Sequence, residues 1–370
     1  MARKALPQRG PRPFTDRRAH SLKTRRERLP WPADKPFRIL SLDGGGIRGL
    51  YAATILARIE RDLLGGGRIA DHVDMIAGTS TGGIIAIGLG LGKPATLIHQ
   101  LYAVDGEAVF PPFWNRRPKL RFWRQLVMPL FNARKLEELL FRTFGTATLG
   151  QSITRLVVPA FLGPKTDIAV FKTDHHPDFK KDHLMAAWEA ARATSAAPTY
   201  FPGHKGDDYV FLDGGVWCNN PIMAAVVDVL SAYQVDRDQI EILSIGTGNP
   251  PYEIGRFAAR GGFFQWREII LGAMYLTTDN AQAQATLLLG PEQILRLEPT
   301  GAGATIDLAD WTAACAQLQP QAQQAFDASR DRLAAFFAEP ADARHRFYTG
   351  EPAGTHKRVA LKDGSAGVDG

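Results

Sequence analysis

The stretch that decides the fold is Phe37-Arg38-Ile39-Leu40-Ser41-Leu42-Asp43-Gly44-Gly45-Gly46-Ile47-Arg48-Gly49. Its apolar first half predicts a strand, its glycines predict a tight loop, and residues 50–56 have the spacing of a helix. Such a junction directs several backbone N–H groups to one point, and the helix dipole adds partial positive charge there. The stretch therefore predicts a site for an anion or a developing oxyanion.

A dinucleotide site is the first alternative, because Gly44, Gly46 and Gly49 fit the spacing G-x-G-x-x-G. Two features argue against it. Asp43 would place a carboxylate beside a pyrophosphate, and the next predicted strand, residues 73–77, does not end in an acidic residue that could bind a ribose. A Walker loop is excluded because no Lys-Ser or Lys-Thr follows the glycines. A Rossmann-type dinucleotide-binding oxidoreductase stays open as an alternative.

The composition is that of a globular protein of enzyme size. With 370 residues, 45% of them hydrophobic, the chain can bury a large core. The two cysteines, Cys218 and Cys315, have no metal-ligand spacing and give no sign of a disulfide framework. The longest uncharged apolar stretch, residues 84–92, is too short to cross a bilayer, and the N-terminus lacks a secretory signal. We therefore expect a cytoplasmic protein.

The positive charge is concentrated at the N-terminus. Residues 1–30 contain ten Lys or Arg against two acidic residues, whereas the remaining 340 residues contain 34 basic and 36 acidic side chains. A basic segment with few apolar residues cannot bury enough surface to fold alone, so residues 1–35 are predicted to be a disordered, solvated tail. Attraction to anionic lipid or nucleic acid and an organellar transit peptide are its alternative interpretations. Because the rest of the chain is nearly neutral, no nucleic-acid polymer is expected as a partner.

Predicted strands and helices alternate along the chain, which indicates an α/β fold with a mainly parallel sheet. Strands are expected at 37–42, 73–77, 156–160, 168–171, 209–212 and 241–245. Helices are expected at 47–64, 95–102, 136–144, 184–192 and 222–233, with an apolar helix after residue 84.

A second glycine motif contains a candidate nucleophile. Gly78-Thr79-Ser80-Thr81-Gly82 matches G-x-S-x-G, in which a serine occupies a sharp strand-to-helix turn and its small neighbours let other backbone pass close by. The alternative is a serine-rich helix cap. The strand before Ser80 and the apolar helix after it favour the nucleophile.

A serine needs a base to accept its proton, and no histidine has a convincing context. His345 and His356 follow in a polar C-terminal stretch, and the earlier histidines have no matching partner. The remaining candidate is Asp213, which a predicted strand delivers to a turn containing Gly214 and Gly215. An Asp-Gly turn that satisfies its own backbone is the alternative.

The three motifs together, in this order, resemble the patatin-like phospholipases. The resemblance covers about residues 36–300 and implies a three-layer α/β/α fold with a mainly parallel central sheet. It also implies a Ser-Asp dyad, with Ser80 as nucleophile and Asp213 as base. The implied oxyanion hole is made by Gly44, Gly45, Gly46 and Arg48, and the supporting glycines are Gly78, Gly82, Gly214 and Gly215. Residues 191–201 and 245–248 also resemble elements that line or support the site in this family.

The implied activity is hydrolysis of fatty-acyl esters in membrane phospholipids, without metal or cofactor. The acidic and histidine residues of 174–183 have no standard metal-ligand spacing. Residues 170–176 and 191–201 look most like the bacterial phospholipases of CBASS anti-phage systems, which implies activation by a cyclic dinucleotide and action at the inner membrane surface. A constitutive lipid acyl hydrolase and a relative that only binds lipid are the alternatives.

Two segments outside the motifs have a composition suited to contact with lipid. Residues 110–131 interleave aromatic and basic side chains, and residues 262–271 are rich in aromatic and aliphatic ones, although core packing would explain either. The chain is expected to divide into the tail (1–35), the phospholipase domain (36–300) and a helical extension (301–370) that packs on the body or on a second subunit of a homo-oligomer.

Overall fold

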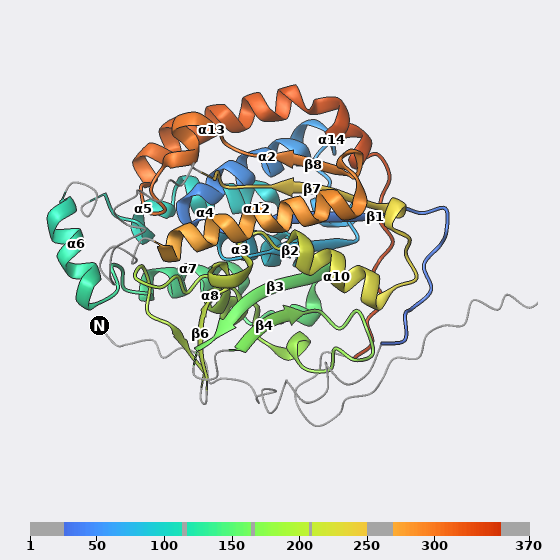
Figure 1. Ribbon diagram of the computed structural model, residues 1–370, viewed down its shortest axis with the longest axis horizontal. Helices are drawn as coiled ribbons and strands as arrows, with labels where there is room; N and C mark the ends of the chain where they lie inside the picture. Colours follow the sequence, from blue (N-terminus) through green and yellow to red (C-terminus); the bar gives the residue numbers. More distant parts are fainter. Residues whose placement is uncertain (1–25, 113–116, 164–166, 207–208, 250–268, 349–370) are drawn as a thin grey trace, which may run out of the picture.

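A computed structural model describes residues 26–112, 117–163, 167–206, 209–249 and 269–348 (Figure 1). Most of the predicted basic tail and the aromatic residues 262–266 lie outside the described residues, as do Phe113, Trp114 and Arg116 of the other aromatic segment.

The centre of the molecule is an eight-stranded sheet in which the expected parallel strands are found. Strands β3, β2, β1, β7 and β8 are neighbours in that order and run parallel. Antiparallel strands β4, β6 and β5 complete the sheet beside β3. The bounds are β1 Phe37–Leu42, β2 Met75–Gly78, β3 Arg155–Leu162, β4 Asp167–Lys172, β5 His204–Lys205, β6 Val210–Asp213, β7 Ile240–Ile245 and β8 Ile294–Leu297.

Helices cover both faces of this sheet, so the expected three-layer α/β/α arrangement is confirmed (Figure 1). Strand β1 shows why: Phe37 and Ile39 point into one apolar core, and Leu40 and Leu42 point into the other. The larger core is covered by α2 Gly49–Asp62, α3 Thr81–Gly90, α4 Ala95–Ala103, α7 Arg134–Phe144, α8 Ala187–Thr194, α13 Trp311–Ala328 and α14 Arg330–Phe336. The smaller core is covered by α10 Ile222–Ala232 and α12 Ile269–Leu289. Shorter helices are α5 Gly106–Val109, α6 Pro118–Val127 and α9 Gly215–Cys218.

The arrangement of strands around β3 brings two distant chain segments together. One edge of β3 pairs with β4. The opposite edge of β3 pairs with residues 75–77 of β2 and, further along, with residues 211–213 of β6. Because β2 is parallel to β3 and β6 is antiparallel, the two strands run toward each other along this edge. The carboxyl end of β2, which leads to Ser80, therefore meets the carboxyl end of β6, which is Asp213.

Several element boundaries differ from the sequence expectations. The helix expected from residue 47 begins as a short 3-10 turn over 46–48, and the helix expected from residue 184 begins at Ala187 because a 3-10 turn over 182–184 precedes it. The prediction did not identify α12 or β8. In the described part of the extension expected at 301–370, the structure has the helices α13 and α14.

Both chain ends of the described region pack against the body. Helix α13 lies on α2, where the Arg58 guanidinium lies 4.2 Å from the centre of the Phe326 ring. At the other end, the Trp31 ring lies 4.6 Å from that of Phe37, and the Leu29 N–H donates to the carbonyl of Ala232. The last residues assigned to the tail thus cover the smaller apolar core.

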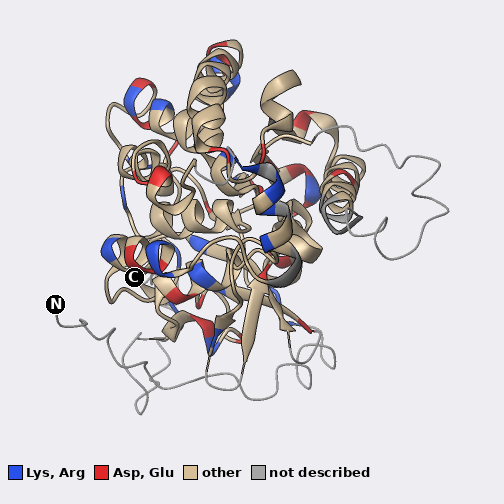
Figure 2. Ribbon diagram, turned by 90° about the vertical axis from the view of Figure 1, so that its left-hand side faces the viewer, with Lys and Arg blue, Asp and Glu red and all other residues tan. Residues whose placement is uncertain are grey.

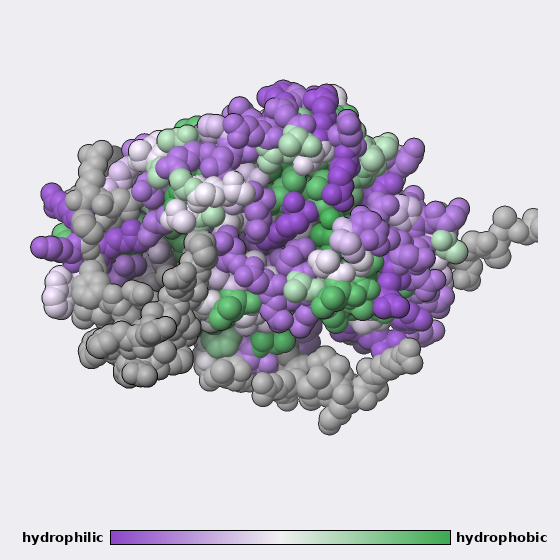
Figure 3. Space-filling model, turned by 45° about the horizontal axis from the view of Figure 1, so that its top comes forward, coloured by the Kyte–Doolittle hydropathy of each residue, from purple (hydrophilic) through white to green (hydrophobic). Residues whose placement is uncertain are grey.

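The face of the molecule that Figure 3 shows is mainly hydrophilic where its residues are coloured. In the view of Figure 3, hydrophobic residues form separate patches rather than one continuous face. Within the described ranges, no helix combines the length and the hydrophobicity that spanning a membrane requires.

Candidate active site

The candidate nucleophile, Ser80, occupies a strained turn between β2 and α3. Its φ of 54° and ψ of −119° are rarely adopted by a residue with a side chain. The turn is possible because a Cβ at Gly78 would lie 2.1 Å from the carbonyl oxygen of Gly82, and one at Gly82 would lie 2.2 Å from that of Leu42. These two glycines therefore let the backbone fold tightly around the serine, as expected for a nucleophile elbow.

Ser80 and Asp213 are brought together. The Ser80 hydroxyl donates to Oδ2 of Asp213 over 2.6 Å, and the backbone N–H of Gly215 donates to Oδ1 over 2.7 Å. Gly214 has no room for a side chain, since its Cβ would lie 2.3 Å from the carbonyl oxygen of Pro159. The carboxylate is thus held by one backbone donor and oriented toward the serine hydroxyl.

Burial raises the pKa of Asp213 to about 6, against the opposing effects of the hydrogen bonds from Ser80 and Gly215 and of the nearby Arg192 guanidinium. Arg192 is itself buried and binds Glu137 Oε1 at 3.1 Å and the carbonyl of Pro202 at 2.6 Å. Near neutral pH the carboxyl group is therefore mainly ionised. Its pKa lies close to the value that suits a general base.

Thr194 positions the backbone of the nucleophile. Its Oγ1 accepts the Ser80 N–H at 2.9 Å and donates to the carbonyl of Pro159 at 2.6 Å. Thr194 belongs to the segment 191–201, for which no role of this residue was predicted. The only sequence signal was its place in that segment, because its partners lie far away along the chain.

The glycine-rich loop lies beside Ser80, and its three glycines differ in their contacts. The Gly44 N–H donates to the carbonyl of Asn219 at 2.9 Å, so this amide is already used, contrary to the expectation for an oxyanion donor. Among the described residues, the N–H groups of Gly45 and Gly46 form no hydrogen bond. Both of these glycines line the same cavity as Ser80.

Arg48 is close to this loop but does not line the cavity. Its buried guanidinium donates to the carbonyls of Gly248 at 3.2 Å and Ala304 at 3.1 Å. Arg48 therefore holds the loop against two later segments instead of facing Ser80, which differs from its expected place in the oxyanion hole.

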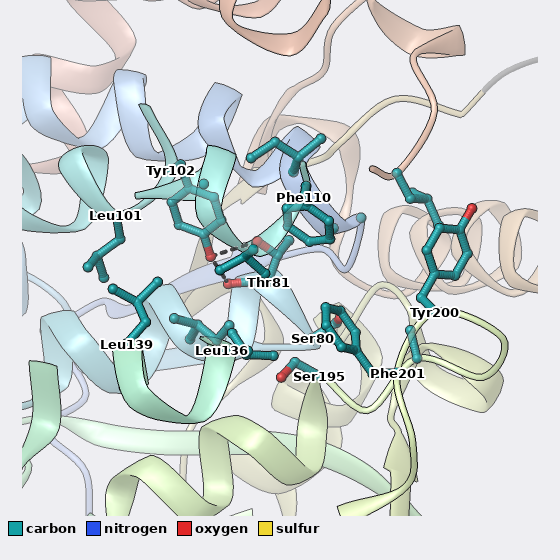
Figure 4. Close-up of a pocket in the computed structure, with 18 of the residues that line it drawn as sticks. Ser80, Thr81, Leu101, Tyr102, Phe110, Leu136, Leu139, Ser195, Tyr200 and Phe201 are labelled. Atoms are coloured by element: carbon teal, nitrogen blue, oxygen red, sulfur yellow. Dashed lines mark hydrogen bonds between the residues drawn. The ribbon is translucent and has the colours of Figure 1, made fainter. Parts of the chain in front are cut away.

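The cavity in front of Ser80 is almost entirely apolar and is open on one side (Figure 4). In this view, the leucines of α4 and α7 lie on one side of Ser80 and Tyr200 lies on the other. The polar groups of Thr81 and Tyr102 bind each other at 2.7 Å, so they offer little to a polar ligand. The apolar lining consists mainly of Ile47, Ile84, Leu101, Val109, Phe110, Leu136, Leu139, Leu140, Ala197, Phe201 and Leu308.

The acidic and histidine residues of 174–183 lie elsewhere. Asp174 binds the Arg344 guanidinium at 2.8 Å, and His175 Nε2 lies 2.8 Å from Asp228 Oδ2. No group of His, Cys, Asp and Glu that could hold a metal ion occurs in the described residues. No histidine is among the residues that line the cavity within the part of the chain that the structure describes.

The chain is similar to several known proteins. A family model described as patatin-like phospholipase matches residues 40–226. A cGAMP-activated phospholipase of Escherichia coli is 37% identical over 60% of this chain and 65% of its own length. A cGAMP-activated phospholipase of Pseudomonas aeruginosa is 35% identical over 67% of this chain and 75% of its own. The crystal structure of VipD from Legionella pneumophila aligns with a TM-score of 0.40 at 15% identity, covering 80% of this chain and 67% of VipD.

Proposed function

The chain belongs to the patatin-like phospholipase family, and from this premise we propose that it hydrolyses fatty-acyl esters of membrane phospholipids with Ser80 and Asp213 as a catalytic dyad. The observation that carries the proposal is the 2.6 Å hydrogen bond from the Ser80 hydroxyl to a buried carboxylate in an apolar cavity. The absence of a histidine from the lining described above favours a dyad over a Ser-His-Asp triad.

The geometry supports a two-step acyl transfer. Ser80 Oγ attacks the ester carbonyl carbon while its proton moves to Asp213 Oδ2. The tetrahedral intermediate then expels the alcohol oxygen of the lipid, which takes the proton from Asp213. Water then attacks the acyl-serine carbonyl carbon while Asp213 accepts its proton. The second tetrahedral intermediate breaks the bond to Ser80 Oγ, which takes the proton back from Asp213, and the free fatty acid leaves.

The developing oxyanion needs donors that are already in place. We assign this role to the backbone N–H groups of Gly45 and Gly46, which have no acceptor among the described residues. Each such donor typically contributes about 2.7–4 kcal/mol to transition-state stabilisation. Gly44 contributes through its missing side chain, because a Cβ there would lie 2.4 Å from Asn219 Oδ1 and 3.2 Å from Ser80 Cβ.

The apolar lining of the cavity suits a fatty-acyl chain. An acyl chain lying along the leucines of α4 and α7 would have its ester end at Ser80 and its headgroup toward the opening. Burial of methylene groups would provide most of the binding energy, at about 0.8 kcal/mol for each.

We further propose control by a cyclic dinucleotide and a role in anti-phage defence at the inner membrane surface. The support is that similar bacterial proteins are cGAMP-activated phospholipases. The alternative is a constitutive lipid acyl hydrolase.

The experiment measures fatty-acid release from phospholipid vesicles by the wild type, Ser80→Ala and Asp213→Asn, each with and without a panel of cyclic dinucleotides. The proposal predicts release by the wild type only, and only with one of the nucleotides. Release without any nucleotide would favour the constitutive alternative. Equal release by the wild type and Ser80→Ala would refute the dyad.

A further inference from the structure

Helix α6, residues Pro118–Val127, projects from the body of the molecule at the left of Figure 1. It exposes large apolar side chains: 48% of Leu120 and 67% of Trp123 are accessible, as is 50% of Met128 directly after the helix. Exposing this much apolar surface in one short segment is unfavourable in water, so a covering partner is expected.

The charge of this segment indicates what that partner is. Residues 117–128 contain no Asp or Glu and four basic residues: Arg117, Lys119, Arg121 and Arg124. Arg117 and Lys119 are exposed at the start of the helix, beside the apolar side chains. Figure 2 faces this side of the molecule, with lysines and arginines in blue. An apolar surface with basic residues around it is complementary to the headgroup region of an anionic bilayer, which attracts each Lys or Arg near its surface.

The segment is fixed to the rim of the catalytic cavity. Arg121 binds both carboxylate oxygens of Asp307 at 2.8 Å and the Tyr200 hydroxyl at 3.3 Å. Tyr200 and Leu308, the neighbour of Asp307, line the cavity. Beyond the helix, the N–H groups of Leu130 and Phe131 donate to the carbonyls of Thr199 and Tyr200. A surface that contacts α6 therefore also lies next to the cavity wall.

We propose that α6 and Met128 form a lipid-docking segment that inserts Leu120, Trp123 and Met128 among the headgroups of an anionic phospholipid bilayer. This inference rests on the proposed lipid substrate and adds how the enzyme contacts it. Docking brings the cavity wall formed by Tyr200 to the bilayer surface, where a phospholipid can enter acyl chain first. The basic side chains extend their aliphatic stems along the same surface and keep their charges at the headgroups.

The test is cosedimentation of the full chain with vesicles, carried out in the Ser80→Ala background so that no substrate is consumed. Vesicles of phosphatidylcholine with phosphatidylglycerol are compared with vesicles of phosphatidylcholine alone. Binding is expected only with the anionic lipid. Leu120→Ser combined with Trp123→Ala is expected to weaken it by about tenfold or more, and Lys119→Glu is expected to weaken it at low salt more than at high salt.

Matched controls lie on other parts of the surface. Leu287→Ser removes an apolar side chain that is 88% exposed on α12, and Lys180→Glu reverses an exposed charge far along the chain from α6. Neither should change vesicle binding.

Circular dichroism and thermal unfolding show whether the α6 variants are folded. Folded α6 variants that bind vesicles as well as the controls would overturn the proposal. So would α6 variants that lose self-association instead of vesicle binding, because a second copy of the chain would then be the partner. Since binding is measured without turnover, failure of docking is distinguishable from failure of the dyad.

Discussion

Arg296 binds Asp43 through two hydrogen bonds, Nη1 to Oδ1 at 3.1 Å and Nη2 to Oδ2 at 2.6 Å. Asp43 is the residue before the glycine loop, and Arg296 lies on β8, two strands away in the sheet. Arg296 Nη1 also donates to Ser244 Oγ on β7 at 2.7 Å, so this one side chain connects the three strands at the base of the loop. Burial raises the pKa of Asp43 to about 6 even though Arg296 lowers it. Without Arg296, the ionised form of this buried carboxyl group would therefore be strongly unfavourable.

Replacement of Arg296 by Met tests whether this pair positions the loop. At pH 8 it leaves a buried carboxylate unpaired, so the free energy of unfolding is expected to fall by about 3–5 kcal/mol in urea titrations. Because the proposed oxyanion donors of the loop would act in the transition state, kcat should fall more than KM rises. Arg296→Lys should recover part of both losses. Arg68→Met is the control, because the exposed Arg68–Asp71 pair contributes about 1 kcal/mol or less. Equal effects of the two Met substitutions would contradict this role.

The pH dependence of activity follows from Asp213. As the proposed base, Asp213 works only when ionised, and burial raises its pKa to about 6, so kcat/KM for a soluble ester should rise with pH through about 6 and then level off. A pH–rate profile with its acidic limb near the usual pKa of an aspartate would contradict the assignment.

The same shift affects stability in the opposite direction. The folded pKa of Asp213 lies above the unfolded value of 3.8, so the native state binds the proton more tightly and loses stability as pH rises from about 4 to about 6. The difference between the unfolded pKa of 3.8 and the folded pKa of about 6 corresponds to about 3 kcal/mol of stability that is lost at higher pH. Asp213→Asn keeps an acceptor for the Gly215 N–H and removes the buried charge. We therefore expect this variant to be inactive but to unfold at a higher temperature than the wild type at pH 8. A lower unfolding temperature at pH 8 would contradict the argument.

Thr194→Val should reduce activity without removing any reacting atom. The isosteric valine cannot accept the Ser80 N–H or donate to the carbonyl of Pro159, which leaves two buried backbone groups unpaired. We expect about 1–3 kcal/mol of destabilisation for each group and a clear loss of kcat through displacement of Ser80. Thr54→Val is the control, because the Thr54 hydroxyl is also buried but only donates to the Leu50 carbonyl within α2. Similar kcat values for the two variants would exclude a positioning role for Thr194.

Gly46→Ala tests the oxyanion loop. The φ of Gly46 is +57°, and a Cβ there would lie 2.3 Å from the Leu308 carbonyl oxygen, so the loop must shift and carry its amides with it. The expected loss in kcat is about 10²–10³-fold, as for removal of one oxyanion donor. Gly65→Ala is matched in backbone conformation, with a φ of +58°, but has open space around it and should leave kcat unchanged. If both alanine variants retained wild-type kcat, Gly46 would have no role in the oxyanion hole.

Features that depend on a short stretch of sequence could be predicted, whereas features that depend on contacts between distant residues could not. The strand before Asp43, the turn at Ser80 and the strand that ends at Asp213 each have a local signature, and all three were identified. Thr194 and Arg296 were missed because each acts through a partner more than a hundred residues away. For the same reason the use of the Gly44 amide by Asn219 could not be foreseen: the glycine motif predicts a loop of amides, but only the tertiary structure decides which of them are already bonded.

The most direct test of the dyad is covalent labelling with a fluorophosphonate, which reacts with activated serines. Intact-protein and peptide mass spectrometry would then be used to locate the adduct. We predict a single adduct on Ser80 in the wild type, none in Ser80→Ala, and labelling at least about a hundredfold slower in folded Asp213→Asn, because the hydroxyl then lacks its base. Labelling of Asp213→Asn at the wild-type rate, or of another serine in place of Ser80, would contradict the Ser80–Asp213 account.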